Sequence, residues 1–343
     1  MISTAAPSAA DVLRLSAAQV DGPLRSAVGQ LPAPLCLGAG FHFGFWDAAG
    51  GPITAAQGKM VRPAFAFAAA RAVNGGAVND TALRAGVAVE LVHNFSLVHD
   101  DVMDQDRTRR GRPTVWVQFG VPCAILVGDG LLALASQVLT QEGDVGAAAM
   151  CAELNSVVVD LCLGQQQDMS FEETLLVSPE SYLEMAAGKT SALLAGSCVL
   201  GAMAGGGTQR QVSALRRFGH HVGLAFQLVD DVLGIFGDPA VTGKPAGADL
   251  LRYKKSMPVL AAMQAGCAAS DELTELYRTQ AITEARLARA VGLVERAGGR
   301  TWTQTEAERQ YRLALDCLEE IGGDARAEAE LAALANLMIN RNR

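Results

Sequence analysis

The sequence predicts an all-α fold, a single-domain helical bundle, and three observations support that prediction. The chain is 50% hydrophobic but only 5% aromatic, and its apolar residues are mainly Ala, Leu and Val, of which Ala and Leu cost little to place in close-packed helices. Apolar residues recur with helical periodicity along most of the chain, whereas strand-like alternation is nearly absent. No low-complexity linker and no repeat of fixed period divides the 343 residues.

The expected elements follow one another between Gly and Pro breaks. Residues 1–50 should form a helix over 11–30 and then a glycine-rich loop that ends at Gly50-Gly51-Pro52, both packed on the core. Residues 51–343 should form one helical domain. Its helices are predicted at 58–74, 78–105, 121–141, 144–171, 178–204, 209–236, 256–267, 270–279, 283–297 and 302–320.

Charge and cysteine usage narrow the class of protein. With 28 Lys and Arg against 36 Asp and Glu, the net charge of −8 argues against a nucleic-acid binder, whose footprint is basic. Seven scattered cysteines, an odd number without a CxxC pair, are typical of reduced core residues in a cytoplasmic protein. The first ten residues lack the features of a secretory signal. The uncharged stretch 190–209 is rich in Gly and Ala, which favours a buried helix over a membrane span.

Two helices each carry a pair of aspartates among apolar residues, Asp100-Asp101 and Asp230-Asp231. Asp104 lies four residues after Asp100, so on a helix both carboxylates project from one face, about 6 Å apart, and repel each other. Mg²⁺ relieves that repulsion, because it binds to a few carboxylates and completes its shell with waters and phosphate oxygens. Asp230 could supply the opposing wall of the same site. For one such motif alone, solvated carboxylates or Arg pairs would explain the pattern equally well.

Basic residues accompany both aspartate segments. Four arginines follow the first segment, and arginine forks match phosphate oxygens; they are Arg107, Arg109, Arg110 and Arg112. Further candidates are Lys59 and Arg62 on one helix face, His93 two turns before Asp100, and Lys189, Thr190, Lys244 and Lys254. Alone, each is more typical of a solvated charge or, for His93, of a core histidine. Together they describe a site for a diphosphate head with a hydrocarbon tail, where metal ions would neutralise the leaving diphosphate.

These motifs, in this order, resemble those of the trans-isoprenyl diphosphate synthases, the polyprenyl synthetase family, from about residue 40 to residue 320. The family's DDxxD and RRGxP elements are matched by residues 100–104 and 109–113, and FQxxDD by residues 226–231. The GKxxRP, ExxHxxSLxHDD, KT and GKxxxxDxxxxK elements are matched at 58–63, 90–101, 189–190 and 243–254. One position departs from the pattern, because the second aspartate motif often ends in Asp where this chain has Gly234. That departure puts in doubt an accessory water or metal contact.

The resemblance implies an isoprenoid-synthase bundle with a central apolar cavity, which condenses isopentenyl diphosphate head-to-tail with an allylic diphosphate to an all-trans product. It implies that the first diphosphate is held by Lys59, Arg62, His93 and Arg110. It implies that the allylic diphosphate contacts Arg109, Lys189, Thr190, Gln227, Lys244 and Lys254. The implied metal is Mg²⁺, three ions per site with Mn²⁺ as a substitute, on Asp100, Asp101, Asp104, Asp230 and Asp231. Catalysis is implied to rest on Asp100, Asp104, Lys189, Asp230 and Lys244, and the protein to be a homodimer.

Product length is expected to depend on Phe95 and Ser96, which precede Asp100 by five and four residues and should point toward the growing tail. By the resemblance, a single aromatic at the fifth position indicates a C20 product, geranylgeranyl diphosphate. Products of C15 or of C25 and longer, and a purely structural Phe95, are the alternatives. A class I terpene cyclase would not need the second diphosphate site of Lys59, Arg62 and His93. A regulatory subunit could lose its aspartates, whereas this chain keeps the first motif complete.

Overall fold

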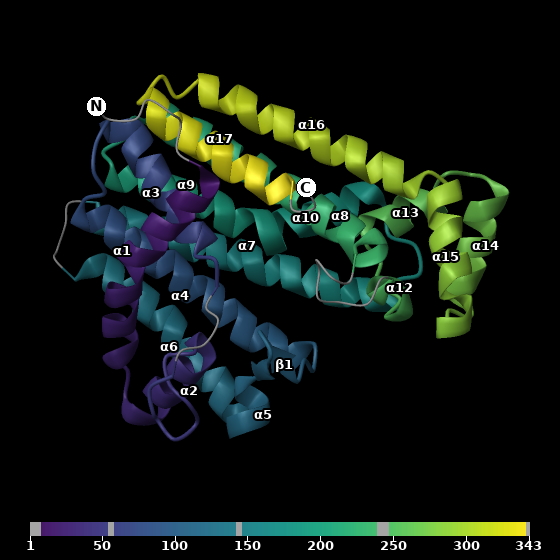
Figure 1. The fold of residues 1–343 in the computed structure, drawn as a ribbon, viewed down its shortest axis with the longest axis horizontal. Coiled ribbons are helices and arrows are strands. Elements are labelled where there is room, and N and C mark those ends of the chain that lie inside the picture. The colour runs from purple at the N-terminus through teal and green to yellow at the C-terminus, as the bar shows by residue number, and fades with distance from the viewer. Residues whose placement is uncertain (1–7, 54–57, 142–145, 239–246, 341–343) are drawn as a thin grey trace. The chain divides into compact units, whose positions relative to one another are not determined.

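The structure is a computed structural model, and it describes residues 8–53, 58–141, 146–238 and 247–340. Helices make up nearly all of the regular structure in these ranges (Figure 1). The two short strands found there, β1 (Thr108–Arg109) and β2 (Arg112–Pro113), pair antiparallel in a hairpin. The predicted all-α fold is therefore confirmed.

The chain folds as two compact units whose segments alternate along the sequence. Unit 1 comprises Met1–Val158, Gly196–Arg216 and Glu320–Leu334. Unit 2 comprises Val159–Ala195, Arg217–Glu319 and Ala335–Arg343. The single helical domain expected over residues 51–343 stays a prediction.

Unit 1 is built around α4, which packs against α3 and α6. The helices wholly inside this unit are α1 (Ala9–Gly29), α2 (Ala33–Phe43), α3 (Val61–Asn74), α4 (Asp80–Met103), α5 (Val115–Phe119) and α6 (Val121–Thr140). The Asn79 side chain caps α4 by accepting a hydrogen bond from the backbone N–H of Ala82 at 2.7 Å. Small residues let α3 approach α4 closely, since a Cβ on Gly86 would lie 2.4 Å from the Phe67 ring.

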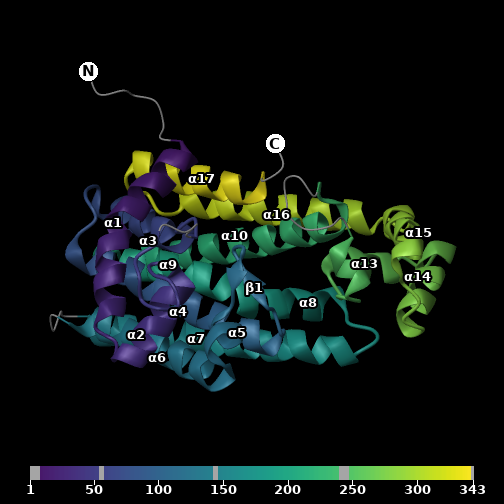
Figure 2. The ribbon, with the colours of Figure 1, turned by 60° about the horizontal axis from the view of Figure 1, so that its bottom comes forward.

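Unit 2 contains the shorter helices of the second half of the chain. Those wholly inside it are α8 (Pro179–Ala186), the π-helix η1 (Ala187–Ser191), α12 (Ala248–Leu251), α13 (Met257–Met263), α14 (Ala268–Arg278), α15 (Glu284–Arg296) and α16 (Gly299–Glu319). Helices α14 and α15 lie side by side in both views (Figures 1 and 2). Residues of both units occur in α7 (Ala147–Glu173), α9 (Ala192–Ala204), α10 (Gln209–Phe236) and α17 (Ala325–Ile339).

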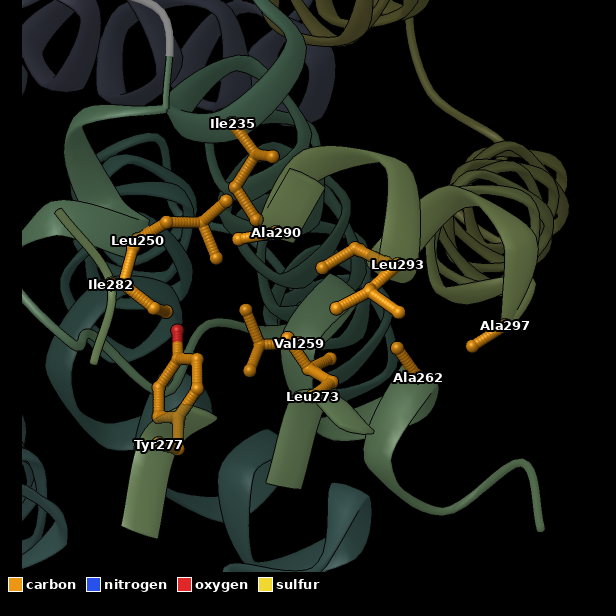
Figure 3. Packing of buried hydrophobic residues seen from close by; sticks show 11 residues of the cluster. Ile235, Leu250, Val259, Ala262, Leu273, Tyr277, Ile282, Ala290, Leu293 and Ala297 are labelled. Carbon is orange, nitrogen blue, oxygen red and sulfur yellow. The ribbon is translucent and has the colours of Figure 1, made fainter. Parts of the chain in front are cut away.

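An apolar cluster joins the ends of α10, α12, α13, α14 and α15 in unit 2 (Figure 3). Val259 and Leu273 face each other at its centre, and Leu293 lies near Ala262. Tyr277 belongs to the same cluster, and its hydroxyl donates a hydrogen bond to the carbonyl of Lys254 at 3.1 Å. The cluster therefore fixes the backbone of a lysine that the sequence analysis singles out.

Four of the described helices were not expected from the sequence: α2, the short helices α5 and α12, and α17. Residues 33–43 were predicted as part of a glycine-rich loop, but they form α2, and α17 follows the last predicted helix. The loop prediction was wrong because Gly38 and Gly40 serve packing there: a Cβ on Gly40 would lie 1.9 Å from the Trp46 ring. Tertiary contacts thus outweigh the low helix propensity of glycine. In place of the helix predicted at 178–204, the structure has α8, η1 and α9 in succession.

Three helical stretches are long and apolar enough to cross a membrane by length and composition alone. They are Val121–Thr140, Ala147–Glu173 and Pro179–Ala204, and 44%, 39% and 72% of their most apolar windows are buried within the protein. Exposed apolar side chains on α6 include Val121, Ile125 and Leu126, and those on α7 include Val159 and Leu163. The third stretch contains most of the uncharged segment predicted as a buried helix, and α9 is indeed mainly buried.

All seven cysteines are free thiols, which agrees with the reduced state expected from the sequence. Only Cys198 and Cys317 are buried, whereas Cys162 and Cys267 are exposed. The expectation that the cysteines are core residues thus holds for some of them only.

Candidate active site

The first aspartate segment lies at the C-terminal end of α4. Asp100 and Asp101 belong to its last turn, and Asp104 is the C-cap, with its N–H donating to the carbonyl of Asp100 at 2.8 Å. Asp100 is half-buried and Asp104 is exposed. Because the C-terminal end of a helix is electrostatically negative, two carboxylates on this turn favour a cation beside them.

Asp101 differs from its neighbours because it is buried, with only 1% of its surface exposed. Its Oδ1 accepts a hydrogen bond from Arg109 Nε at 2.8 Å and forms an ion pair with Arg109 Nη2 at 2.7 Å. Burial raises the pKa of Asp101, and the contact with Arg109 opposes that shift. The predicted metal ligand Asp101 and the predicted substrate contact Arg109 are therefore bound to each other.

The β1–β2 hairpin positions the arginines that follow. Arg110 and Gly111 have positive φ angles of 52° and 73°, as a tight turn between two short strands requires. The Arg110 guanidinium lies against the backbone of Gly58, where a Cβ would be 2.9 Å from Nη2. Lys59, which follows Gly58 in the sequence, is exposed. The hairpin thus places Arg110 beside the GKxxRP segment that the sequence analysis assigns to the same diphosphate.

Arg62, His93 and Arg110 form one electrostatic cluster in unit 1. The pKa of Arg62 is lowered to about 10, mainly by burial; the charge of Glu90 opposes this shift and that of Arg110 adds to it. Burial together with the charges of Arg62 and Arg110 holds the pKa of His93 well below its usual range, so this imidazole is neutral at pH 7. Two guanidinium groups and a neutral histidine around a single carboxylate leave an excess positive charge that suits an anion.

Phe95 and Ser96 are both buried on α4, at 5% and 7% exposure. The Phe95 ring packs edge-on against the His99 imidazole, with ring centroids 5.1 Å apart. His99 in turn reaches α6, where its Nε2 lies 3.0 Å from the carbonyl of Ile125. The Ser96 hydroxyl donates to the carbonyl of His93 at 2.9 Å.

In unit 2, Lys189 and Thr190 are presented by the π-helix η1. Short π-helical segments inside helices often mark functional positions, because they turn side chains that a regular helix would aim elsewhere. Close packing requires glycine around η1. A Cβ on Gly164 would lie 2.2 Å from the backbone nitrogen of Lys189, and one on Gly223 would lie 2.5 Å from the Ser191 Cα. The Lys189 ammonium donates to the Asp168 carboxylate.

A chain of hydrogen bonds joins η1 to the second aspartate segment on α10. Thr190 Oγ1 donates to Gln227 Oε1 at 2.7 Å, and Gln227 Nε2 donates to Asp231 Oδ1 at 3.0 Å. The other oxygen of Asp231 accepts hydrogen bonds from the Tyr182 hydroxyl at 2.5 Å and from the Met257 N–H at 3.1 Å. Asp231 is buried, which raises its pKa to about 6, whereas Asp230 is exposed.

Lys254 completes this second cluster. Burial lowers its pKa, but the carboxylates of Asp231 and Asp249 outweigh burial and raise it overall. Asp249 also lies against Gly234, where a Cβ would be 2.2 Å from its Oδ2. The space that a side chain at position 234 would need is thus already filled by a carboxylate. Lys244 lies outside the described residues.

The structure brings the predicted residues together as two sets. Arg62, His93, Asp100, Asp101, Asp104, Arg109 and Arg110 lie in unit 1, and Lys189, Thr190, Gln227, Asp230, Asp231 and Lys254 lie in unit 2. Sequence reasoning missed Asp168 and Tyr182. Asp168 could have been singled out from the sequence, since it is the only charged residue between Leu161 and Phe171. Tyr182 offers none, because only the fold brings its hydroxyl to Asp231.

Comparison with known proteins decides the family. The family model described as polyprenyl synthetase matches residues 47–294. The chain belongs to the polyprenyl synthetase family. Membership in this family makes the protein a prenyltransferase of isoprenoid biosynthesis that elongates prenyl chains.

Individual relatives agree with this assignment. A geranylgeranyl diphosphate synthase from Mycobacterium tuberculosis is 45% identical over 323 residues, which cover 93% of this chain and 91% of the relative. A (2E,6E)-farnesyl diphosphate synthase from Mycobacterium bovis is 39% identical over 334 residues, with 96% and 92% coverage.

Solved structures share the fold over the full length. A polyprenyl synthetase from Streptomyces coelicolor superposes with a TM-score of 0.92 at 44% identity, covering 96% of this chain and 99% of that one. A geranylgeranyl pyrophosphate synthase from Corynebacterium glutamicum, complexed with isoprenyl diphosphate and magnesium, has a TM-score of 0.80 at 28% identity, with 97% and 98% coverage.

Proposed function

We propose that the enzyme condenses isopentenyl diphosphate head-to-tail with an allylic diphosphate to give all-trans geranylgeranyl diphosphate. The observation that carries this proposal is that basic side chains occur in two groups, Arg62 and Arg110 in unit 1, and Lys189 and Lys254 among carboxylates in unit 2. A condensing enzyme must hold two diphosphates at once, whereas a class I terpene cyclase binds one. The complete first aspartate motif also disfavours a regulatory subunit.

The cluster in unit 1 suits the diphosphate of isopentenyl diphosphate. Arg62 and Arg110 supply forked donors for phosphate oxygens, and Lys59 and His93 add further contacts. A neutral His93 can donate one hydrogen bond without adding to the repulsion between the two guanidinium groups. Binding of the diphosphate end fixes the position of the alkene in the same molecule, so that the alkene attacks the allylic carbon in one orientation.

The cluster in unit 2 suits the allylic diphosphate. Lys189, Thr190, Gln227 and Lys254 would hold the leaving diphosphate after the allylic C–O bond breaks, with Arg109 and Lys244 as the further proposed contacts. Their charges and dipoles are already fixed by hydrogen bonds to Asp168 and Asp231, so little reorganisation is needed when negative charge develops on the leaving group. The proton lost from the condensation product passes to the departing diphosphate.

The donor set fits a divalent cation. Among the described residues, no group of three or more His, Cys, Asp or Glu side chains is arranged to hold a metal ion. Asp100 and Asp104 offer carboxylates one turn apart, and Asp230 offers an exposed one, which suits Mg²⁺ completed by waters and diphosphate oxygens. When bound, such ions neutralise the leaving diphosphate. We propose three Mg²⁺ ions per site, replaceable by Mn²⁺, with Asp101 and Asp231 in supporting roles because both are buried and hydrogen-bonded within the protein.

The C20 product is supported by two observations. The relative named geranylgeranyl diphosphate synthase is more similar to this chain than the one named farnesyl diphosphate synthase, at 45% against 39% identity. Phe95 places one buried ring on α4 five residues before Asp100, and the next residue, Ser96, is small. We propose that the tail grows past Ser96 within an apolar cavity of the bundle and is stopped at Phe95.

We further propose a cytoplasmic homodimer without a membrane span. Each of the three apolar stretches carries a charged residue near its middle: Asp129 in α6, Asp160 in α7 and Lys189 in η1. Asp129 and Asp160 are exposed, and an exposed carboxylate at mid-depth is costly in a bilayer. The exposed apolar residues of α6, Val121, Ile125 and Leu126, suit an interface with a second copy instead.

Incubation with Mg²⁺, isopentenyl diphosphate and each of the C5, C10 and C15 allylic diphosphates tests the proposal. After dephosphorylation, chromatography should show one C20 alcohol from every starter, and chelation of the metal should abolish it. A shorter or longer product would revise the chain length. Conversion of an allylic diphosphate to a cyclic hydrocarbon without isopentenyl diphosphate, or no conversion at all, would contradict the proposed condensation.

A further inference from the structure

Hydrogen-bonded polar side chains join α2 and α4 in unit 1, two of them buried and the third, His42, half-buried. Asn94 and Glu90 lie one turn apart on α4 and are only 0% and 3% exposed. His42, the penultimate residue of α2, lies beside them. Three polar side chains in an apolar core are costly unless each finds a partner, so their arrangement points to a role.

The hydrogen bonds along this chain have a defined direction. Asn94 Nδ2 donates to Glu90 Oε1 at 2.9 Å and to the Glu90 carbonyl at 2.8 Å. The amide oxygen of Asn94 is therefore an acceptor, and it lies 3.1 Å from His42 Nε2. Burial and the charge of Arg110 lower the pKa of His42 to about 3, so the ring is neutral and carries its single hydrogen on Nε2. Every link of the chain thus directs hydrogen-bond donation toward Glu90.

Glu90 interacts electrostatically with two arginines of the candidate diphosphate site, Arg62 and Arg110. Burial raises the pKa of Glu90, while the charge of Arg62, the hydrogen bond from Asn94 and the charge of Arg110 lower it. Those three interactions favour the ionised carboxylate. In return, Glu90 opposes the mutual repulsion of Arg62 and Arg110. The buried Nε of Arg62 has no hydrogen-bond partner within the described part of the chain.

We propose that Glu90, held in place by Asn94 and His42, is a positioning residue that fixes the guanidinium groups of Arg62 and Arg110 for the diphosphate of isopentenyl diphosphate. This inference rests on the proposed condensation. Glu90 itself is buried, so it acts through the arginines and not by touching the substrate. Its effect should therefore fall on one substrate of the two.

Steady-state kinetics of Glu90→Gln test this role, because Gln keeps the shape and the hydrogen bond from Asn94 but removes the charge. The KM for isopentenyl diphosphate should rise about tenfold or more, because misplaced binding groups cost one to two orders of magnitude. The KM for the allylic diphosphate should stay within about twofold of wild type, since the charge of Glu90 acts on the other cluster. Glu90→Asp, which restores the charge, should recover part of the loss.

The matched control is Glu330→Gln. Glu330 is also buried in unit 1, at 8% exposure, and pairs with Arg71 at 2.5 Å, but neither residue belongs to the candidate site. This control should leave both KM values unchanged. If Glu90→Gln fails to fold, His42→Phe decides the question, because it keeps a ring but removes the donor to Asn94 and should raise the same KM selectively, by about threefold.

The outcomes separate the inference from the function on which it rests. If wild-type enzyme does not consume isopentenyl diphosphate, the proposed condensation fails. If wild-type enzyme condenses both substrates but the Glu90 and His42 variants leave the KM for isopentenyl diphosphate unchanged, the positioning role is overturned. It is equally overturned if both KM values rise by the same factor or if Glu330→Gln produces the same shift.

Discussion

Completing the second aspartate motif by substitution at Gly234 should damage the protein. From the motif alone, Gly234→Asp would add a carboxylate where the family often has one. In the structure, a Cβ at this position would lie 2.2 Å from Asp249 Oδ2 and 2.7 Å from its Cγ, against 3.4–4 Å for ordinary contacts. Any side chain at position 234 therefore has to push the Asp249 carboxylate away by more than 1 Å.

The magnitude follows from two opposing effects. Replacing a helical glycine by alanine stabilises an open site by up to about 1 kcal/mol. Overpacking of this kind costs about 1–3 kcal/mol, so Gly234→Ala should be destabilising by up to about 2 kcal/mol net. Gly234→Asp should be worse, because a second carboxylate about 4 Å from Asp249 adds repulsion that solvent screens only in part. For a chain of 343 residues, a loss of about 2 kcal/mol corresponds to a Tm lower by about 3 °C.

Thermal unfolding followed by calorimetry or circular dichroism measures this effect. Gly29→Ala is the matched control, because Gly29 is also helical, in α1, and a Cβ added there would meet nothing within 4 Å. It should leave Tm unchanged or raise it. The Gly234→Ala loss should shrink in an Asp249→Ala background, which removes the clash. A Gly234→Ala variant as stable as Gly29→Ala would refute the proposed crowding.

Three further predictions concern product length, pH and assembly. Phe95→Ala should yield products longer than C20, read by chromatography of the dephosphorylated prenols; an unchanged distribution would make Phe95 a packing residue only. His42 has a folded pKa of about 3 against 6.5 in the unfolded chain, so it stabilises the fold fully above pH 6.5 and progressively less toward pH 3. His42→Phe should therefore make Tm fall less between pH 6.5 and 4, because the pH-dependent free energy of unfolding that it removes is on the order of a few kcal/mol at most. An unaltered slope of Tm against pH would count against a neutral ring in the folded protein. Ile125→Glu on the exposed face of α6 should shift the protein toward monomer in sedimentation, whereas an unchanged mass would place the interface elsewhere.

The sequence was informative where a residue's role follows from local spacing. The four-residue spacing of Asp100 and Asp104 predicts a shared helix face, and the structure places Asp100 in the last turn of α4 and Asp104 at its C-cap. The apolar, aromatic-poor composition predicts packed helices, which the fold also confirms. The ordered motifs predicted the family, which the matched residues 47–294 confirm.

What sequence reasoning missed depends on long-range contacts. The middle aspartates of both segments look like further metal ligands in the sequence, but Asp101 is paired with Arg109, and Asp231 accepts from Tyr182 across 49 positions. Helix α2 was missed because its glycines are explained only by long-range packing, Gly38 against Val127 and Gly40 against the Trp46 ring. The π-helix η1 has no local signature either, since it depends on glycines of α7 and α10.

The separation of the two diphosphate sites is the central claim, and paired KM measurements on Arg62→Gln and Thr190→Val test it most directly. Arg62→Gln should raise the KM for isopentenyl diphosphate by about tenfold or more while leaving that for the allylic diphosphate nearly unchanged. Thr190→Val should do the reverse, because it breaks the hydrogen bond to Gln227 in the other cluster. If each variant raises both KM values by a similar factor, the two clusters do not bind separate substrates and the account is contradicted.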